Sequence, residues 1–138
     1  MIGISEPADS AETEALAAAD AIVAAFGNHR RDEYFRGFAP DATFVFHTHP
    51  ARLECRAEYE QLWHEWEDLH GFRVHNCVST NRRVQLVDTV AIFTHDVVTE
   101  STMDGQREIG RERETIVLQR HAGVWLAIHE HLSPASHL

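Results

Sequence analysis

The sequence predicts an α+β fold in which N-terminal helices pack on a curved antiparallel sheet formed by the rest of the chain. Apolar residues recur at helical spacing in three segments that all precede residue 72. Runs rich in β-branched and aromatic residues then continue toward the C-terminal end, separated by turn signals such as Asp104-Gly105. Helices at one end of a chain and a strand meander at the other are typical of this fold class.

Three helices are expected in the first half of the chain. Ser10 is a favourable N-cap for the first helix, which Gly27 is placed to end. A second, short helix is expected over His29–Phe38. The third spans Arg56–His70 with Gly71 as its C-cap, and its apolar stripe consists of Tyr59, Leu62, Trp63, Trp66 and Leu69.

The first strand is expected directly after Pro40-Asp41, a pair that breaks the second helix. Turns at Asp88, Asp104-Gly105 and Ala122-Gly123 divide the C-terminal half of the chain. With these breaks, the expected strands are Ala42–His47, Phe72–Thr80, Arg82–Val87, Val90–Glu100, Glu108–Arg120 and Val124–Ser133. The length is that of a single domain over residues 1–138, with an ordered core expected over about 10–134.

Charge and composition limit the classes of partner and cofactor. The 138 residues carry a formal charge of −10, and acidic proteins repel phosphate backbones, so nucleic acid is not an expected partner. No apolar run is long enough to span a bilayer, so no membrane partner is expected. The acidic N-terminal segment is unlike a signal peptide, which predicts a cytoplasmic location. All 12 basic residues are Arg; the lack of Lys excludes lysine-bound pyridoxal phosphate, and no cofactor is expected.

Histidine is unusually frequent, with 11 in the chain. Its charge changes near neutral pH, and its imidazole is a common metal ligand. One interpretation of the excess is a metal site built from His47, His49 and a later histidine; the other is strand ends and solvent contacts. Because no HxxxH motif or Cys–His cluster occurs, no metal site is expected. Cys55 and Cys77 lie far apart without a CxxC motif and are expected to be free thiols.

Particular segments resemble a known family. Phe38–Phe44 (FAPDATF) is similar to the start of the first strand in the SnoaL-like branch of the nuclear transport factor 2-like superfamily. Arg113–Leu118, Gly123–Trp125 and Ile128–Ser133 are similar to the closing hairpin of that family, and this ending also resembles the association domain of calmodulin-dependent kinases. The resemblance covers about residues 12–134 and implies a cone-shaped fold with a pocket between helices and sheet.

The last strand holds the main candidates for acid–base chemistry, because side chains alternate between its two faces. One face would carry Trp125, Ala127, His129, His131 and Ser133, and the other Leu126, Ile128, Glu130 and Leu132. The resemblance to the kinase association domain and the greater apolarity of the second set favour Glu130 inside the pocket, where burial would raise its pKa. The alternative places His129 and His131 inside, and a bulge could reverse the alternation locally.

Other candidate site residues come from the third helix and the middle strands. The Tyr59 hydroxyl is suited to hydrogen-bond a ligand carbonyl, and the stripe to which it belongs is either an aromatic pocket wall or core packing. The kinase resemblance points His95 inward, as a proton-transfer group or a structural histidine. The expected catalytic set is Glu130, His95 and Tyr59. The expected ligand contacts are Trp63, Trp66, Phe93, Ile116, Leu118, Leu132 and His47.

Two functions are consistent with these residues. The first is a SnoaL-like enzyme, a cyclase, isomerase or dehydratase that uses cofactor-free acid–base chemistry on a small apolar or aromatic carbonyl compound. The second is a non-catalytic ligand-binding or dimerisation domain, because a fold alone does not specify a reaction. The resemblance implies a homodimer in both cases, with Trp125, Val117 and Thr115 as candidates for its interface.

Overall fold

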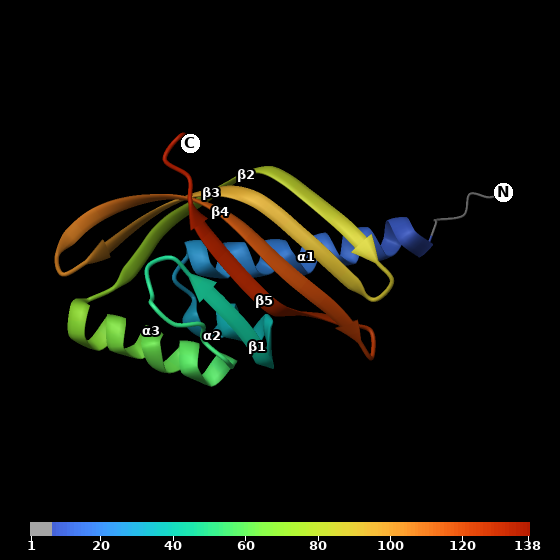
Figure 1. Ribbon diagram of the computed structural model, residues 1–138, viewed down its shortest axis with the longest axis horizontal. Coiled ribbons are helices and arrows are strands. Elements are labelled where there is room, and N and C mark those ends of the chain that lie inside the picture. The colour runs from blue at the N-terminus through green and yellow to red at the C-terminus, as the bar shows by residue number, and fades with distance from the viewer. Residues whose placement is uncertain (1–6) are drawn as a thin grey trace.

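The computed structural model describes residues 7–138. Two helices come first, followed by a strand, a third helix and a run of four strands. The elements are α1 (Pro7–Gly27), α2 (Arg31–Arg36), β1 (Phe38–Phe46), α3 (Arg56–His70), β2 (Arg73–Val87), β3 (Val90–Met103), β4 (Gln106–His121) and β5 (Val124–Pro134). The strands form one bent sheet in the order β1-β5-β4-β3-β2, with α1 lying along one of its faces (Figure 1).

The expected α+β fold class is confirmed, and one feature of the sheet differs from the expectation. Strands β2 to β5 form an antiparallel meander, as expected. β1 instead pairs in parallel with β5, so the sheet is mixed rather than antiparallel. After β1 the chain crosses through α3 to the far edge and returns strand by strand, which brings β5 beside β1. A parallel pair needs such a long connection, and local patterning does not specify the partner.

Most element boundaries lie close to the expected ones, and α3 agrees residue for residue. Its C-cap is Gly71, whose left-handed backbone (φ 62°) favours glycine. The two strands expected at 72–80 and 82–87 are one continuous strand, because the chain passes Asn81 through a bulge rather than a turn. α1 begins at Pro7, before the expected N-cap Ser10; residues 1–6, expected to be a loose arm, lie outside the described part of the chain.

Register shifts bend the sheet around the helices. β2 carries two shifts against β3, β5 carries one against β4, and β1 carries one against β5. Each such irregularity bends its strand and increases the local twist. At the curled end of the sheet, the Asp104 amide in the β3–β4 turn donates to the His70 carbonyl at 2.6 Å, and the two side chains hydrogen-bond at 2.7 Å. This contact joins the β3–β4 hairpin to the C-terminus of α3 (Figure 1).

One hydrophobic cluster joins the helices to the inner face of the sheet. Its largest fully buried side chains are Trp63, Tyr34, Phe38, Phe44, Phe93, Ile116, Leu118 and Val74. Aromatic rings from α2, α3 and β1 contact one another edge to face; the Phe44 and Tyr59 centroids, for example, lie 4.7 Å apart. Ala135 is also buried, and its amide donates to the Arg111 carbonyl, so the packed structure continues past the expected limit at 134.

Two further expectations were that the cysteines are free thiols and that no segment spans a membrane. Cys55 and Cys77 are free thiols, as expected. None of the described helices is both long and apolar enough to cross a membrane. The cytoplasmic location stays a prediction.

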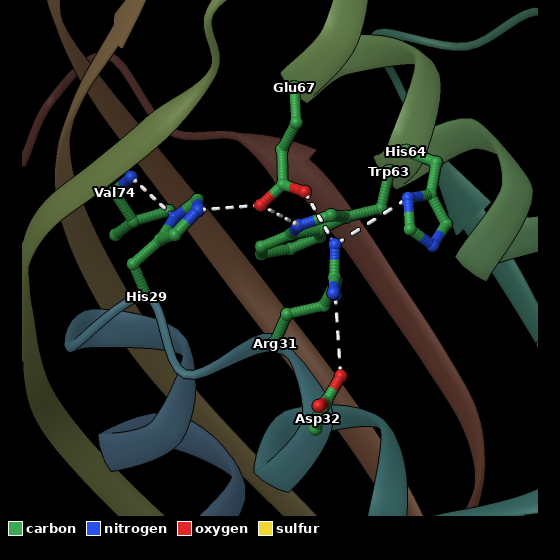
Figure 2. A network of polar contacts seen from close by, with 7 residues as sticks. All are labelled: His29, Arg31, Asp32, Trp63, His64, Glu67 and Val74. Carbon is green, nitrogen blue, oxygen red and sulfur yellow. Dashed lines mark hydrogen bonds and ion pairs between the residues drawn. The ribbon is translucent and has the colours of Figure 1, made fainter.

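A polar network ties the α1–α2 connection to α3 and β2 (Figure 2). His29 Nδ1 accepts the backbone N–H of Val74 at 2.9 Å, so Nε2 carries the ring proton and donates to Glu67 at 2.8 Å. The same carboxylate accepts the indole N–H of Trp63 at 2.9 Å and a guanidinium N–H of Arg31 at 2.7 Å. Burial opposes ionisation of Glu67, but these donors and the Arg31 charge outweigh it, so the pKa of Glu67 is lower than usual.

Replacing Glu67 tests the contribution of this network to stability. Glu67→Gln turns an acceptor oxygen into a donor that faces other donors, and we expect a loss of about 1–3 kcal/mol in the free energy of unfolding near neutral pH. Because folding lowers the pKa of Glu67, its contribution is present above the unfolded-state pKa of about 4.3. The contribution disappears as the pH falls through the lower folded-state value. Urea denaturation at several pH values measures both effects.

The matched control is Glu65→Gln, at an exposed position of the same helix. A surface change of this kind is expected to alter the free energy of unfolding by less than about 0.5 kcal/mol. Equal losses in the two variants, or a loss in Glu67→Gln that does not depend on pH, would contradict the role given to Glu67.

Candidate functional site

A cavity of about 480 Å³ lies between the helices and the inner face of the sheet. Its volume falls within the range of small-molecule sites. The apolar part of its wall includes Ile22, Phe26, Phe46, Trp66, Phe72 and Leu132. The polar part is made chiefly of hydroxyl and carboxyl groups, which include those of Tyr34, Tyr59, Thr99, Glu112, Glu114 and Glu130.

β5 delivers Glu130 to this cavity by means of a bulge. Trp125 and Ala127, in the first half of the strand, are buried against the core. Consecutive residues of β4 then pair with Ala127 and His129, so Ile128 is the extra residue and the alternation reverses there. Beyond the bulge, Glu130 is only 3% exposed and lines the cavity. The even-numbered face therefore points inward only after the bulge, and the odd-numbered face does so before it.

Glu130 shares a hydrogen bond with a second buried carboxyl group, that of Glu114 on β4, which is 8% exposed. In the β4–β5 ladder Glu114 pairs with Leu132 and Ile116 pairs with Glu130, so the two carboxyl groups are diagonal neighbours. Burial raises the pKa of both groups, most strongly that of Glu130, where the charge of Glu114 adds to the effect. Two carboxyl groups can share a hydrogen bond only if one of them keeps a proton.

His95 donates to Glu114, and the stronger rise in the pKa of Glu130 makes Glu114 the ionised member of the pair. Arg82 donates to the Ser79 oxygen at 2.7 Å, so the Ser79 hydroxyl is free to donate to His95 Nδ1 at 2.6 Å. Nε2 then carries the ring proton, which His95 donates to Glu114 at 2.6 Å. Burial and the nearby Arg82 charge lower the pKa of His95 to about 4, so its ring is neutral near pH 7. As the ionised member, Glu114 accepts from His95 on one side and from Glu130 on the other.

Two tyrosine hydroxyls complete the other side of the pair. Tyr34 donates to Glu130 at 3.0 Å, and the hydroxyl oxygens of Tyr34 and Tyr59 lie 2.9 Å apart. Since Tyr34 uses its only proton on Glu130, Tyr59 donates to Tyr34. Burial raises the pKa of both phenols well above the usual value, so both keep their protons at neutral pH. Each of these groups therefore has a partner when Glu130 holds the proton and Glu114 holds the charge.

The remaining polar groups of the wall are acidic or unreactive. Glu108 and Glu112 line the cavity together with the carboxyl pair, and none of the described lining residues is Arg or His. Cys77 also lines it, but burial raises the pKa of this thiol to about 12. A thiol in that state is not a nucleophile at neutral pH. The chemistry available at the wall is therefore that of carboxyl and hydroxyl groups.

The structure brings four of the predicted site residues to the cavity wall and places the others elsewhere. Those at the wall are Tyr59, Trp66, Glu130 and Leu132. His95 lies behind Glu114, and His47 lies outside the wall, where it hydrogen-bonds Glu112 at 2.6 Å. The fully buried core holds Trp63, Phe93, Ile116 and Leu118.

The alternative catalytic pair does not reach the cavity. His129 is half-buried and hydrogen-bonds Thr43 at 2.8 Å, His131 is exposed, and neither lines the cavity. Trp125 is a correction to the expected dimer interface, because it is 8% exposed and belongs to the core on the inner side. The bulge that follows Trp125 is the reason, since it reverses the alternation on which the expectation was based. Within the described part of the chain, no group of His, Cys, Asp and Glu side chains is arranged to hold a metal ion.

Sequence reasoning missed Glu114, Glu112 and Tyr34 as site residues, although one signal was present for the first. Asp104-Gly105 forms a two-residue turn with positive φ at both positions, which pairs Met103 with Gln106. Counting back along the two strands from that turn places Glu114 directly opposite His95. The alternation of Glu and Arg along β4 places residues 108, 112 and 114 on one face. Tyr34 has no such signal, because its contact with Glu130 joins elements far apart in the chain.

Helices packed on a bent sheet around an apolar cavity define the cone-shaped class known as nuclear transport factor 2-like. The SnoaL-like domain model matches residues 15–137, and the chain belongs to this family. No curated protein sequence matches it.

Solved structures share this fold at low sequence identity. A nuclear transport factor 2-like protein from Cytophaga hutchinsonii superposes with a TM-score of 0.75 at 9% identity, over 95% of this chain and 100% of that chain. A putative calcium/calmodulin-dependent kinase II association domain from Exiguobacterium sibiricum gives 0.74 at 16% identity, over 96% and 98%. A ketosteroid isomerase-like protein from Erwinia carotovora atroseptica gives 0.74 at 17%, over 89% and 95%. Likeness at this level concerns the fold alone.

Replacing Glu130 tests where the shared proton lies. The carbonyl of Glu130→Gln would accept from Tyr34 and its amide N–H would donate to Glu114, as the protonated acid does, so we expect a loss of less than about 1 kcal/mol in unfolding free energy. Folding raises the pKa of Glu130. The contribution of Glu130 to wild-type stability should therefore fall as the pH rises above the unfolded-state value of about 4.3.

Glu130→Gln lacks this titration, so its stability relative to wild type should improve as the pH rises from about 5 to about 8. Urea denaturation across this range measures the difference, and Glu108→Gln, at an exposed position of β4, is the control. A loss of more than about 3 kcal/mol in Glu130→Gln near neutral pH would show that Glu130 is the ionised member.

Proposed function

We propose that this protein is a small-molecule enzyme that moves protons on an apolar carbonyl compound bound in the cavity, without a cofactor. The observation that carries the proposal is the Glu114–Glu130 pair, in which two carboxyl groups at the cavity wall share a hydrogen bond. In many enzymes the catalytic acid and base are two titratable groups whose environments push their pKa values apart. The apolar and aromatic character of the rest of the wall supports a ligand of the same character.

The pair supplies a base and an acid in one turnover. The ionised carboxylate accepts a proton from the carbon next to the carbonyl group, and the C–H electron pair forms an enolate. The protonated carboxyl group returns a proton to carbon, at the same position or a conjugated one, as the enolate reverts to the ketone. The pair begins and ends with one proton, so no co-reactant is needed. This balance fits an isomerase most directly, and a cyclase or dehydratase would begin with the same abstraction.

Neighbouring groups have distinct roles in this proposal. Tyr59 stabilises the enolate oxygen, because its hydroxyl lines the cavity and rotation about the C–O bond turns its proton from Tyr34 to a ligand. His95 is a positioning residue: its N–H holds Glu114 in one orientation and favours its ionised form. Trp66 contacts the apolar body of the ligand.

Hydrogen exchange in D₂O tests this chemistry without knowledge of the natural substrate. We expect the protein to accelerate deuterium incorporation next to the carbonyl group of 2-tetralone or cyclohex-3-en-1-one, measured by proton NMR. Glu130→Gln should lower the catalysed rate about 10²–10⁴-fold, because it removes the acid–base group. Tyr59→Phe should lower it about 10–10³-fold, because it removes the donor to the enolate oxygen. His95→Gln should shift the pH dependence of the rate, since it acts through Glu114.

The control for these variants is Glu14→Gln, at an exposed position of α1 that does not line the cavity. It should exchange at the wild-type rate. The proposal is wrong if wild type and Glu130→Gln exchange each ketone at the same rate.

The second candidate function is that of an association domain, and the outer face of the sheet favours it. Val78 is 48% exposed on this face, and Thr115 and Val117 are half-buried there. One structure with the same fold is described as a putative kinase association domain. We propose a homodimer through this face, an arrangement that is compatible with catalysis in the cavity on the opposite side of the sheet.

Introducing a charged residue on the outer face of the sheet tests the proposed dimer. Val117→Arg should convert a dimer to a monomer with an unchanged far-ultraviolet circular dichroism spectrum, because an unpaired charge is costly in a buried interface. Multi-angle light scattering measures the mass. Val124→Arg, at a position 55% exposed beside the β4–β5 turn, should remain dimeric. A monomeric wild-type protein at high concentration would contradict the proposal.

A further inference from the structure

We infer that the natural ligand of the cavity carries a protonated nitrogen on a flat apolar body, so that the cavity is selective for amines. This inference rests on the proposed use of the cavity as a ligand site. It adds the sign of the ligand's charge, which the acid–base chemistry alone does not specify.

The charges at the cavity wall are all of one sign. Glu108, Glu112 and the Glu114–Glu130 pair contribute carboxyl groups, and the described lining residues include no Arg and no His. Lys is absent from the whole sequence. A ligand with a carboxylate or phosphate would therefore meet like charges without a cation to receive it, at a cost of several kcal/mol. A ligand with an ammonium group would meet acceptors only.

The separation of charge on β4 is systematic. Along this strand the acidic residues that line the cavity alternate with basic residues, so side chains of opposite sign lie on opposite faces. The basic residues of this segment are Arg107, Arg111 and Arg113. All three are exposed, and none of them lines the cavity. These arginines would neutralise the inward carboxylates if they lay on the same face of the strand. They lie on the opposite face, so the inward charge is left negative.

The buried carboxyl pair provides a separate argument. The side chains that donate hydrogen bonds to it, the His95 ring and the Tyr34 hydroxyl, are both neutral. Arg82 is separated from Glu114 by Ser79 and His95; it donates to Ser79 and pairs with Asp20. A carboxylate removed from water is costly unless a cation compensates it. An ammonium group in the cavity would supply that compensation, and its own hydrogens would find acceptors in the carboxyl oxygens.

The aromatic part of the wall suits the rest of such a ligand. Tyr59, Trp66, Phe72 and Phe26 contribute rings to the lining. A ring face attracts a cation and also packs against a flat apolar body. Because aliphatic residues complete the wall, the amine is expected to be attached to an apolar skeleton rather than to a sugar or a peptide.

Three probes with one skeleton test the sign of the charge. They are 2-phenylethylamine, 2-phenylethanol and phenylacetate, which present a cation, a neutral group and an anion on a phenyl ring. Binding is followed by the tryptophan fluorescence of the wild-type protein, since Trp66 lines the cavity, and by calorimetry. We expect the amine to bind at least about tenfold more tightly than the alcohol, and phenylacetate to bind most weakly.

Charge-neutral variants locate the effect in the cavity. Glu112→Gln and Glu108→Gln should each weaken amine binding about three- to tenfold while the alcohol is unaffected, because each removes one carboxylate from the wall. Glu14→Gln removes the same charge from an exposed position of α1 and should leave amine binding unchanged. Gly110→Leu should block all three probes, because a Cβ at this lining position meets only Glu112 Oε1, at 3.8 Å, and the longer side chain then occupies the cavity.

Binding of the amine should be linked to proton release from the carboxyl pair. An alkylammonium group stays charged between about pH 6 and pH 8, as Lys does, so the amine should bind more tightly at the higher pH while the alcohol shows no such dependence. α1 contributes only apolar residues to the lining. The titratable groups that face the pair or the adjoining wall come from the other elements, namely Tyr34, Tyr59, Cys77, His95, Glu108, Glu112 and, beyond Glu112, His47.

Several outcomes would overturn the inference. They are tighter binding of the alcohol or of phenylacetate than of the amine, equal effects of Glu112→Gln and Glu14→Gln, and no amine binding up to about 10 mM. Failure of the proposed function is distinguishable from these. Selective amine binding without ketone exchange would leave this inference standing and remove the catalytic proposal. Ketone exchange with preferred binding of the alcohol would do the reverse.

Discussion

The hydrogen bond between Glu114 and Glu130 confines one proton and one negative charge to a site where water solvates neither fully. Donors on both sides hold the two carboxyl groups, and the stronger rise in the pKa of Glu130 assigns the proton to it. His95 donates to Glu114, and Tyr34 donates to Glu130. Each of these donors has its own direction fixed by the next group outward. The result is a protonated carboxyl group beside a carboxylate, both oriented by neutral hydrogen-bond donors.

The fold assembles this pair from elements that are distant in the chain. The tight β3–β4 turn sets the register that places Glu114 opposite His95, and the bulge at Ile128 turns Glu130 inward. α2 and α3 bring their tyrosine hydroxyls to the same point, and the hydrogen bonds accepted by Glu67 fix α3 against the α1–α2 connection. Because the bulge also bends the sheet, the curvature that makes room for a cavity and the orientation of its main titratable group have a common cause.

Local patterns in the sequence predicted the parts of the structure that depend on local physics. The apolar stripe and Gly71 gave α3 without error, and both Trp66 and Tyr59 of that stripe reach the cavity. Non-local pairings were not predictable in the same way. The parallel partner of β1 depends on a crossover, and the inward position of Trp125 depends on a one-residue bulge that leaves no clear mark in the sequence. Glu130 was identified because a lone carboxylate on an apolar face is unusual, whereas its partner Glu114 looked like one of many charged residues on β4.

The most direct test of the shared proton is to measure the protonation states of Glu114 and Glu130. A ¹³C NMR titration of the side-chain carboxyl carbons does this, with assignments from Glu114→Gln and Glu130→Gln. The account predicts that Glu130 shows the chemical shift of a protonated acid near neutral pH and that Glu114 shows that of a carboxylate. It also predicts that the two signals respond together when the pair finally loses its proton, because coupled groups titrate jointly. Two carboxylate signals already present at about pH 5, titrating independently near the ordinary Glu value of about 4.3, would contradict it.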